Sequence, residues 1–247
     1  MLTEKEKLEH DILLILGETA HPIGCGTLSA LLGKREYDLS EATVGRMLRD
    51  FDLAGYTEKS GFQGRSLSEH GRARLMALTE CEKRFQWETE FASALKAHSR
   101  NQLLEVLVAR RAIESELAAL AAENSTPEFL SKLHKVLEQQ RKTLVSGLVT
   151  ADQDVAFHAC IAEMAGNRVL GAAIAMIRQD SQLSPVLEGI RRHVHSMVYV
   201  DHAAIFDAIA AQSPENARCA MIRHINNIIL DVNRFDETAQ SETFKGV

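Results

Sequence analysis

The chain of 247 residues is long enough for two domains, since a domain commonly has roughly 100–200 residues. Apolar residues make up 45% and charged residues 25%, which excludes a disordered or collagen-like chain, and the low aromatic share of 5% favours helices over an all-β fold. The formal net charge of −6 excludes a polycationic protein, so any nucleic-acid binding must depend on a local basic face.

The cysteines and the apolar stretches indicate the compartment. The four cysteines are scattered without a CxxC pair, and no signal peptide opens the chain. This usage is typical of reduced thiols in a cytoplasmic protein. The longest apolar stretches are shorter than the roughly 18–20 residues that a membrane span needs. We therefore expect a cytoplasmic protein with no membrane partner.

The N-terminal residues follow the order of a winged helix-turn-helix module. Helical apolar patterns cover residues 3–17, 27–32 and 40–55, and Ser40 is a suitable N-cap for the third helix. Two strand-like runs, residues 56–60 and 65–68, flank a tip at residues 61–64 that has a glycine at each end. In such a module the third helix enters the major groove of DNA and the hairpin forms the wing.

The candidate DNA contacts lie on the third helix and the wing. Thr43 and Arg46 are best placed to reach base edges. Phosphate or minor-groove contacts are expected from Arg49, Lys59 and Arg65. Residues 34–74 hold eight Lys/Arg against seven Asp/Glu, so affinity would depend on positioned cations and not on domain charge. A solvated surface side chain is the alternative interpretation of each contact.

From residue 69 onward, apolar residues recur at helical spacing in every segment. The segments cover residues 69–97, 100–123, 128–147, 152–165, 167–180, 184–197, 199–212 and 215–235. This series predicts an all-helical bundle that is large enough to bury its own core. We place the domain boundary near residues 78–82, which gives a winged-helix domain at 1–80 and a helical domain at 81–247. The expected fold class is mainly α, with three helices and a β-hairpin wing followed by an all-α bundle.

One aspartate and three histidines are the candidate metal ligands of the bundle. Asp154 and His158 lie four residues apart and project from one face of a helix. His202 and His224 lie on two later helices among apolar neighbours, so both are expected to point inward, and His195 is a spare candidate. Three imidazoles and a carboxylate suit a divalent transition metal of the Zn, Ni or Mn type. Spacing alone leaves a second interpretation open, in which these are core histidines with satisfied hydrogen bonds and no metal.

Four blocks of sequence resemble FadR-type regulators of the GntR superfamily and their FCD effector domain. The blocks are RRAIESELAALAA from residue 110, DVAFH from 154 with AGN from 165, DHAAI from 201 with DAI from 207, and AMIRHI from 220. They occur in the family's order and at near-family spacing over about residues 85–235. Together they are specific, although each block alone is weak.

The resemblance implies a particular ligand set and effector. By block matching, Asp154, His158, His202 and His224 would hold the metal. The family's effectors are typically small carboxylates seated against the metal and a basic side chain, which corresponds here to Arg110. Asn167, in the family's Gly-Asn step, is expected to line the same pocket.

The N-terminal third departs from the GntR pattern. Residues 34–39 lengthen the turn before the recognition helix, which begins SEATVGR at residue 40. The run GRSLSEHG at residues 64–71 is more similar to the winged helices at the front of some nitrogen-type repressors. The DNA contacts of GntR proteins therefore do not transfer to this chain.

The sequence is consistent with three functions. The leading hypothesis is a homodimeric transcriptional regulator, not an enzyme, in which metal and a small organic acid alter binding to double-stranded operator DNA. The first alternative is a metal-dependent, hydrolase-like enzyme that uses the His₃Asp site, although the nearest carboxylate along the helix, Glu163, is a poor general base. The second alternative is a metal-free helical interaction module.

Overall fold

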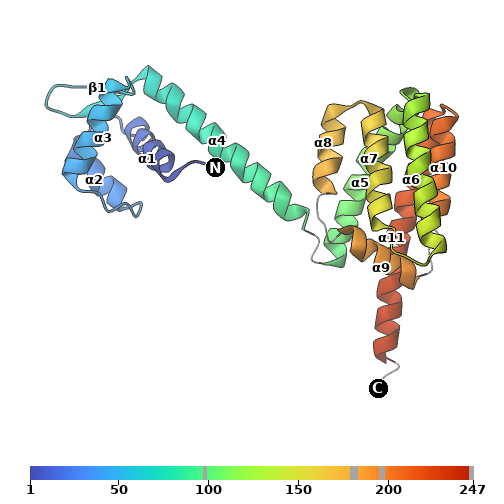
Figure 1. Cartoon of the computed structure of the whole chain (residues 1–247). Coiled ribbons are helices and arrows are strands. Elements are labelled where there is room, and N and C mark those ends of the chain that lie inside the picture. Colours follow the sequence, from blue (N-terminus) through green and yellow to red (C-terminus); the bar gives the residue numbers. More distant parts are fainter. Residues whose placement is uncertain (97–98, 179–182, 195–197, 245–247) are drawn as a thin grey trace. The chain divides into compact units, whose positions relative to one another are not determined.

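The computed structural model describes residues 1–96, 99–178, 183–194 and 198–244. It divides into two compact units, Met1–Ala92 and Ser93–Val247. The fold is mainly helical with one small two-stranded sheet among the described residues, which confirms the expected fold class. The predicted boundary near residue 80 falls within a continuous helix, α4 (Glu69–Ala94). Figure 1 labels the helices and strands of both units.

The N-terminal unit opens with three helices, α1 (Glu4–Glu18), α2 (Cys25–Gly33) and α3 (Glu41–Leu53). Thr3 and Glu6 form a reciprocal capping box at the start of α1. Ser40 caps α3 as expected, because its hydroxyl accepts a hydrogen bond from the backbone N–H of Thr43. Apolar side chains of all three helices, including Leu13 and Leu48, make the buried core of this unit.

The wing is an antiparallel pair of strands, β1 (Thr57–Lys59) and β2 (Arg65–Leu67). Ile23, which precedes α2, exchanges two backbone hydrogen bonds of 3.0 Å with Arg65 and so pairs with β2 at the end next to the hairpin tip. Gly64 has a φ of +122°, and a Cβ there would lie 2.2 Å from the carbonyl carbon of Ile23. Only glycine therefore fits this position, and the tip end of β2 is fixed to the segment that precedes α2.

The described residues of the C-terminal unit form seven helices, which Figure 1 labels. They are α5 (Arg100–Glu123), α6 (Pro127–Val145), α7 (Ala151–Ala165), α8 (Arg168–Ile177), α9 (Leu183–His193), α10 (Val198–Ala210) and α11 (Pro214–Phe244). α5 packs against α7, α8, α10 and α11, and α6 packs against α7 and α10. The central helix α5 therefore brings its side chains next to those of several partners, and the core of the unit forms around it.

The helix ends of this unit follow local sequence signals. Ser99 and Thr126 cap α5 and α6, and Pro127 occupies the first turn of α6. Gly166 ends α7 in the left-handed conformation, with a φ of +69°, and Asn167 then caps α8. The helix α11 continues to Phe244, beyond the expected end at 235. Within the described ranges, no helix combines the length and apolar character of a membrane span.

Candidate metal centre

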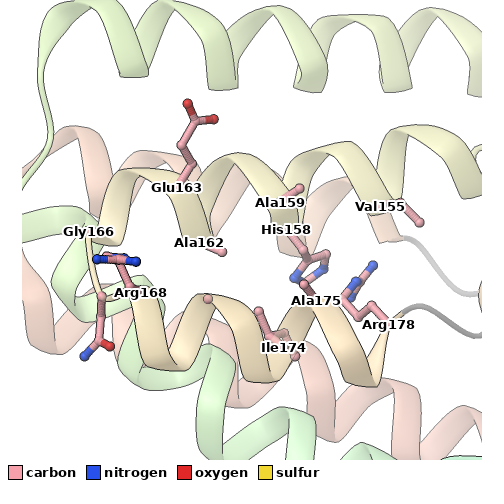
Figure 2. Close-up of a pocket in the computed structure, with 12 residues that line it drawn as sticks. Val155, His158, Ala159, Ala162, Glu163, Gly166, Arg168, Ile174, Ala175 and Arg178 are labelled. Atoms are coloured by element: carbon pink, nitrogen blue, oxygen red, sulfur yellow. The ribbon is translucent and has the colours of Figure 1, made fainter.

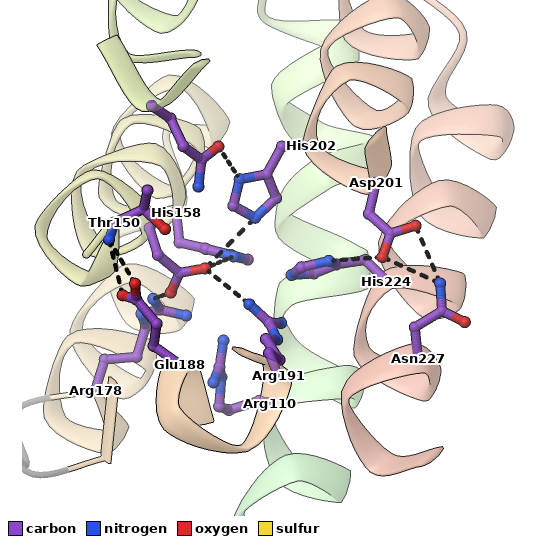
Figure 3. A network of polar contacts seen from close by, with 12 residues as sticks. Arg110, Thr150, His158, Arg178, Glu188, Arg191, Asp201, His202, His224 and Asn227 are labelled. Carbon is purple, nitrogen blue, oxygen red and sulfur yellow. Dashed lines mark hydrogen bonds and ion pairs between the residues drawn. The ribbon is translucent and has the colours of Figure 1, made fainter. Parts of the chain in front are cut away.

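Asp154, His158, His202 and His224 converge inside the C-terminal unit. Figure 3 shows the three imidazoles directed toward one another. Asp154 and His158 come from α7, His202 from α10 and His224 from α11. One ligand atom of each residue lies within 4.8 Å of the others. The three imidazoles are buried, and Asp154 is nearly so. The structure thus brings together all four residues that the sequence names.

Two of the imidazoles have a polar side chain of another helix beside Nδ1, which is a hydrogen bond at His202 and a longer contact at His224. His202 Nδ1 lies 2.8 Å from Oε1 of the buried Gln140, and its ring stacks on Phe157 with centroids 4.2 Å apart. His224 Nδ1 lies 3.5 Å from Asp201 Oδ2. Such outer partners orient an imidazole so that its Nε2 faces the centre of the group.

The third imidazole has the same arrangement. His158 Nδ1 contacts the buried carboxylate of Glu114. The Nε2 atoms of His158, His202 and His224 are all buried without a hydrogen-bond partner, as is Oδ1 of Asp154. Asp154 Oδ1 lies 3.8 Å from His158 Nε2 and 3.5 Å from His202 Nε2. Buried polar atoms without partners are rare, so four that face each other fit a bound cation.

Burial decides the protonation of the imidazoles. It lowers the pKa of His158 and His202, and it lowers the pKa of His224 to about 4. The three rings are therefore neutral near pH 7 and keep a lone pair for a metal. Burial alone would raise the pKa of Asp154, but the guanidinium groups of Arg178 and Arg191 outweigh burial and hold this pKa well below its ordinary value. Asp154 is therefore a carboxylate.

Arginines surround the acidic side of the group. Arg178 donates a hydrogen bond of 2.7 Å to Asp154 Oδ2, and Arg191 lies 3.6 Å from Asp154 Oδ1. The expected effector residue Arg110 is buried, with its Nε donating to Glu114 Oε1 at 2.7 Å. Its Nη2 atom is buried without a hydrogen-bond partner.

The cavity beside Arg110 is small. It measures about 20 Å³ and is bordered by Arg110, Asp154 and residues of α9, among them Leu187, Glu188 and Arg191. Asn167, the second expected effector residue, does not lie there. Its side chain accepts hydrogen bonds from the backbone N–H groups of residues 169 and 170, and it borders a larger pocket between α7 and α8.

Comparison with known proteins identifies the C-terminal unit. Residues 105–227, about half of the chain, match the FCD domain model. The chain belongs to the FCD-type GntR family. The HTH-type transcriptional repressor NanR of Escherichia coli (strain K12) is 31% identical over 131 residues, which cover 52% of this chain and 50% of NanR. NanR of Salmonella arizonae is 31% identical over 129 residues, which cover 51% of this chain and 49% of that protein. This FCD protein thus spans about half the length of the curated relatives it matches.

The N-terminal unit matches a different model. Residues 10–75 of the FCD protein match the winged-helix domain of ribonuclease R. Among solved structures, GntR of Streptococcus agalactiae aligns with 92% of this chain and 99% of its own at 19% identity and a TM-score of 0.46. The E. coli protein McbR/YncC aligns with 95% of this chain and 99% of its own at 18% identity and a TM-score of 0.49.

The structure places the expected DNA contacts of the FCD protein on α3 and on the two strands of the wing. Thr43, Arg46 and Arg49 lie on α3, where both arginines are exposed and Arg46 donates to the Thr43 hydroxyl at 3.3 Å. Lys59 is exposed on β1. Arg65 is instead paired with both oxygens of Asp52 at 2.7–2.9 Å, and its side chain is 15% exposed.

The wing tip presents a residue that sequence reasoning passed over. Phe62 is fully exposed between the glycines at 61 and 64. An aromatic ring at the tip of a wing is a side chain that can wedge between bases in the minor groove. The spare ligand candidate His195 lies outside the described residues.

Several buried polar residues around the FCD centre also escaped the sequence argument. Glu114 carried a signal, because it follows Arg110 by four positions on one helix. Asp201 is adjacent to His202 in sequence, but adjacent residues on a helix face different ways. Gln140, Arg178 and Arg191 gave no signal, because their partners lie on other helices.

Proposed function

We propose that this FCD protein is a transcriptional regulator that works in the cytoplasm as a homodimer on two-fold operator DNA. In this proposal the FCD domain holds a divalent transition metal and a small carboxylate effector, and both alter operator binding. The observation that carries the proposal is the set of four unpartnered ligand atoms from Asp154, His158, His202 and His224. Its family membership and the repressor function of the NanR relatives support the regulatory role.

The donor set supports a metal of the Zn, Ni or Mn type. Three neutral imidazole nitrogens and one carboxylate oxygen are ligands that these ions accept, while hard cations such as Ca²⁺ prefer oxygen alone. Four protein ligands leave one or two positions free in a five- or six-coordinate ion. A bound metal would supply a Lewis acid that anchors the oxygen atoms of an organic acid.

Arg110 supports a carboxylate as the effector. Its Nη2 is a buried donor without a partner and borders the cavity beside Asp154. A cavity of about 20 Å³ has room for about one water molecule, so an acid requires α9 to move outward. Glu188 of α9 accepts the backbone N–H of Thr150 at 2.7 Å, next to the start of α7. An effector that displaces α9 would therefore act on the segment leading into the metal-ligating helix.

The N-terminal unit supplies the DNA-binding surface in this proposal. The exposed Arg46 and Arg49 on α3 suit the major groove, and Lys59 and Phe62 suit contacts from the wing. Arg65 remains a candidate contact of the wing, where its ion pair with Asp52 holds the side chain in place.

Two alternatives fit the structure less well. An enzyme needs an acid or base near the metal, and Glu163 is exposed, paired with Lys132 and directed away from His158 (Figure 2). A metal-free module would bury four polar atoms without partners, and each such atom costs roughly 1–3 kcal/mol.

The function is tested with the promoter region of the protein's own gene. We expect the full chain to shift this duplex at low salt, and the affinity to fall steeply as salt rises. We also expect Zn²⁺ to raise the melting temperature of chelator-treated wild type and to leave His202→Ala unaffected, while this variant still binds the duplex. A chain that binds neither this duplex nor Zn²⁺ would refute the proposal.

A further inference from the structure

Phe62 at the tip of the wing is the most exposed large apolar side chain among the described residues. Its exposed fraction is 111%, against 88% for Leu53, the next in order. Burial of an aromatic ring is strongly favourable, yet this ring takes no part in the core of its unit. Single exposed apolar residues are common on protein surfaces, so a role for Phe62 depends on how the tip presents it and on what surrounds it.

Backbone hydrogen bonds close the tip around this ring. The N–H of Ser60 donates to the carbonyl oxygen of Gly64 at 2.9 Å, and the N–H of Gln63 donates to that of Ser60 at 3.0 Å. Just after the tip, the start of β2 is paired with Ile23. Phe62 is therefore carried by a closed turn, and a group that is already held in place loses less conformational freedom when it binds.

The side chains around the ring suit the minor groove of DNA. The ten residues from Lys59 onward contain two cations, the second of which is Arg65, and no carboxylate. These two cations are opposite each other in the strand register, directly behind the tip. Lys59 is exposed, Asp52 of α3 holds Arg65, and Gln63 is exposed next to Phe62. Cations and amide side chains beside an apolar wedge are the combination with which proteins read the minor groove and separate its base steps.

We propose that Phe62 is a wedge that enters the minor groove of the operator, partly unstacks one base step and bends the duplex. The proposal rests on the regulatory function proposed above and adds a deformation of the DNA to it. Wedges of this kind bend DNA by about 20–90° toward the major groove. The bend costs least at the flexible pyrimidine–purine steps TA and CA/TG. We therefore expect the protein to select operators with such a step where the wing lies, even without a hydrogen bond to its bases.

Two substitutions at the tip separate the wedge from the rest of the DNA-binding surface. Phe62→Ala removes the ring, and we expect it to abolish most of the bend and to weaken binding about tenfold at an unchanged melting temperature. Phe62→Leu keeps an apolar wedge and should retain most of the bend. Phe91→Ala removes an exposed phenylalanine of α4 outside the wing and is the matched control, which should bind and bend DNA like wild type.

The full chain is tested on circularly permuted fragments of the promoter region of its own gene, whose mobility in a gel reports the bend. Permanganate adds a local readout, because it oxidises a thymine preferentially where the base is unstacked. We expect wild type, Phe62→Leu and Phe91→Ala to bend the fragments and to make one thymine reactive, and Phe62→Ala to leave that thymine protected.

The outcomes distinguish the wedge from the proposed function. A bend and a permanganate pattern that Phe62→Ala leaves unchanged would overturn the wedge and leave DNA binding intact, as would a wild type that binds the promoter without bending it. A wild type that does not bind the promoter would remove the regulatory function and the wedge together. An unchanged bend in Phe62→Ala, combined with altered sedimentation of this variant without DNA, would assign the ring to an interface with a second copy of the chain.

Discussion

At the scale of single residues, the three histidines share one arrangement. Each imidazole has an outer polar side chain beside Nδ1, as a hydrogen bond at His202 and as an ion-pair contact at His158 and His224, and each leaves Nε2 buried without a hydrogen bond. The outer contacts come from Gln140, Glu114 and Asp201, on α6, α5 and α10. Three separate helices therefore fix the rings before any cation arrives, which reduces the ordering that binding requires.

Gln140 gives a direct test of this preorganisation. We expect Gln140→Ala to weaken Zn²⁺ binding about 10–100-fold, because His202 loses the partner that fixes its ring orientation. Gln139→Ala, at the exposed neighbouring position, is the control and should bind like wild type. Competition against a metallochromic chelator measures both. Equal affinities in the two variants would show that the Gln140 contact does not orient the ligand.

Tyr37 tests the electrostatics of the N-terminal unit. Its hydroxyl donates to Asp11 Oδ2 at 2.7 Å, and burial together with Asp11 raises its pKa to about 12. Folding thus favours the neutral phenol, so the stabilisation is present below pH 10 and is lost as the pH rises from about 10 to about 12. The difference in phenolate absorbance between wild type and Tyr37→Phe should titrate near pH 12, and Asp11→Asn should lower that midpoint. A Tyr37 midpoint near pH 10 in wild type would contradict the contact.

The sequence predicts the convergent ligands better than it predicts their surroundings. Asp154 and His158 could be placed on one face because a helix has a fixed period, and the apolar neighbours of His202 and His224 indicated that both point inward. Gln140 lies 62 positions from His202, and no local pattern marks such a pair. Asn167 shows a further limit, since its side chain caps α8 instead of approaching Asp154.

At the scale of elements, the wing depends on one backbone position. Gly64 holds a φ of +122° against the backbone of Ile23, whereas Gly61 has a φ of +53° and open space around it. The two glycines thus flank the same tip, but Gly64 is restricted by both its φ and the neighbouring backbone, whereas Gly61 is restricted by its φ alone. Phe62 lies between them and is exposed, and the pairing of Ile23 with Arg65 holds the chain just after this tip.

This difference predicts unequal costs for alanine. Gly64→Ala should lower the free energy of unfolding by about 2–4 kcal/mol, because it combines backbone strain with a clash. Gly61→Ala should cost about 1 kcal/mol, since a left-handed conformation is its only penalty. Urea unfolding followed by circular dichroism measures both values. Equal costs would mean that the wing is not pinned to Ile23.

The elements themselves follow from sequence to within a few residues. Caps at Ser40 and Thr126 and the breaks before Pro127 and Pro214 set helix starts near the expected positions. The largest difference lies in α11, which runs to Phe244 although its apolar pattern fades after residue 235. The apolar pattern of a sequence marks only the part of a helix that packs against the core. A helix without a breaking residue can continue beyond that part, so the pattern underestimates the length of the helix.

At the scale of the whole molecule, the two units carry different parts of the proposed function. The candidate DNA contacts all lie in Met1–Ala92 and the candidate metal centre lies in Ser93–Val247. A regulator requires a coupling free energy of roughly 1–3 kcal/mol between such sites. The division into a winged helix and a helical bundle was predictable because the apolar period changes along the chain. The boundary was less predictable, because α4 continues through residue 80 without a break.

The metal content of the full chain tests the central claim most directly. We expect mass spectrometry to find about one equivalent of a divalent transition metal in wild type and in His134→Ala, which removes an exposed histidine. The double variant Asp154→Ala/His224→Ala should contain almost none while keeping its helical circular dichroism spectrum. A double variant that retains as much metal as wild type would contradict the assignment of the centre.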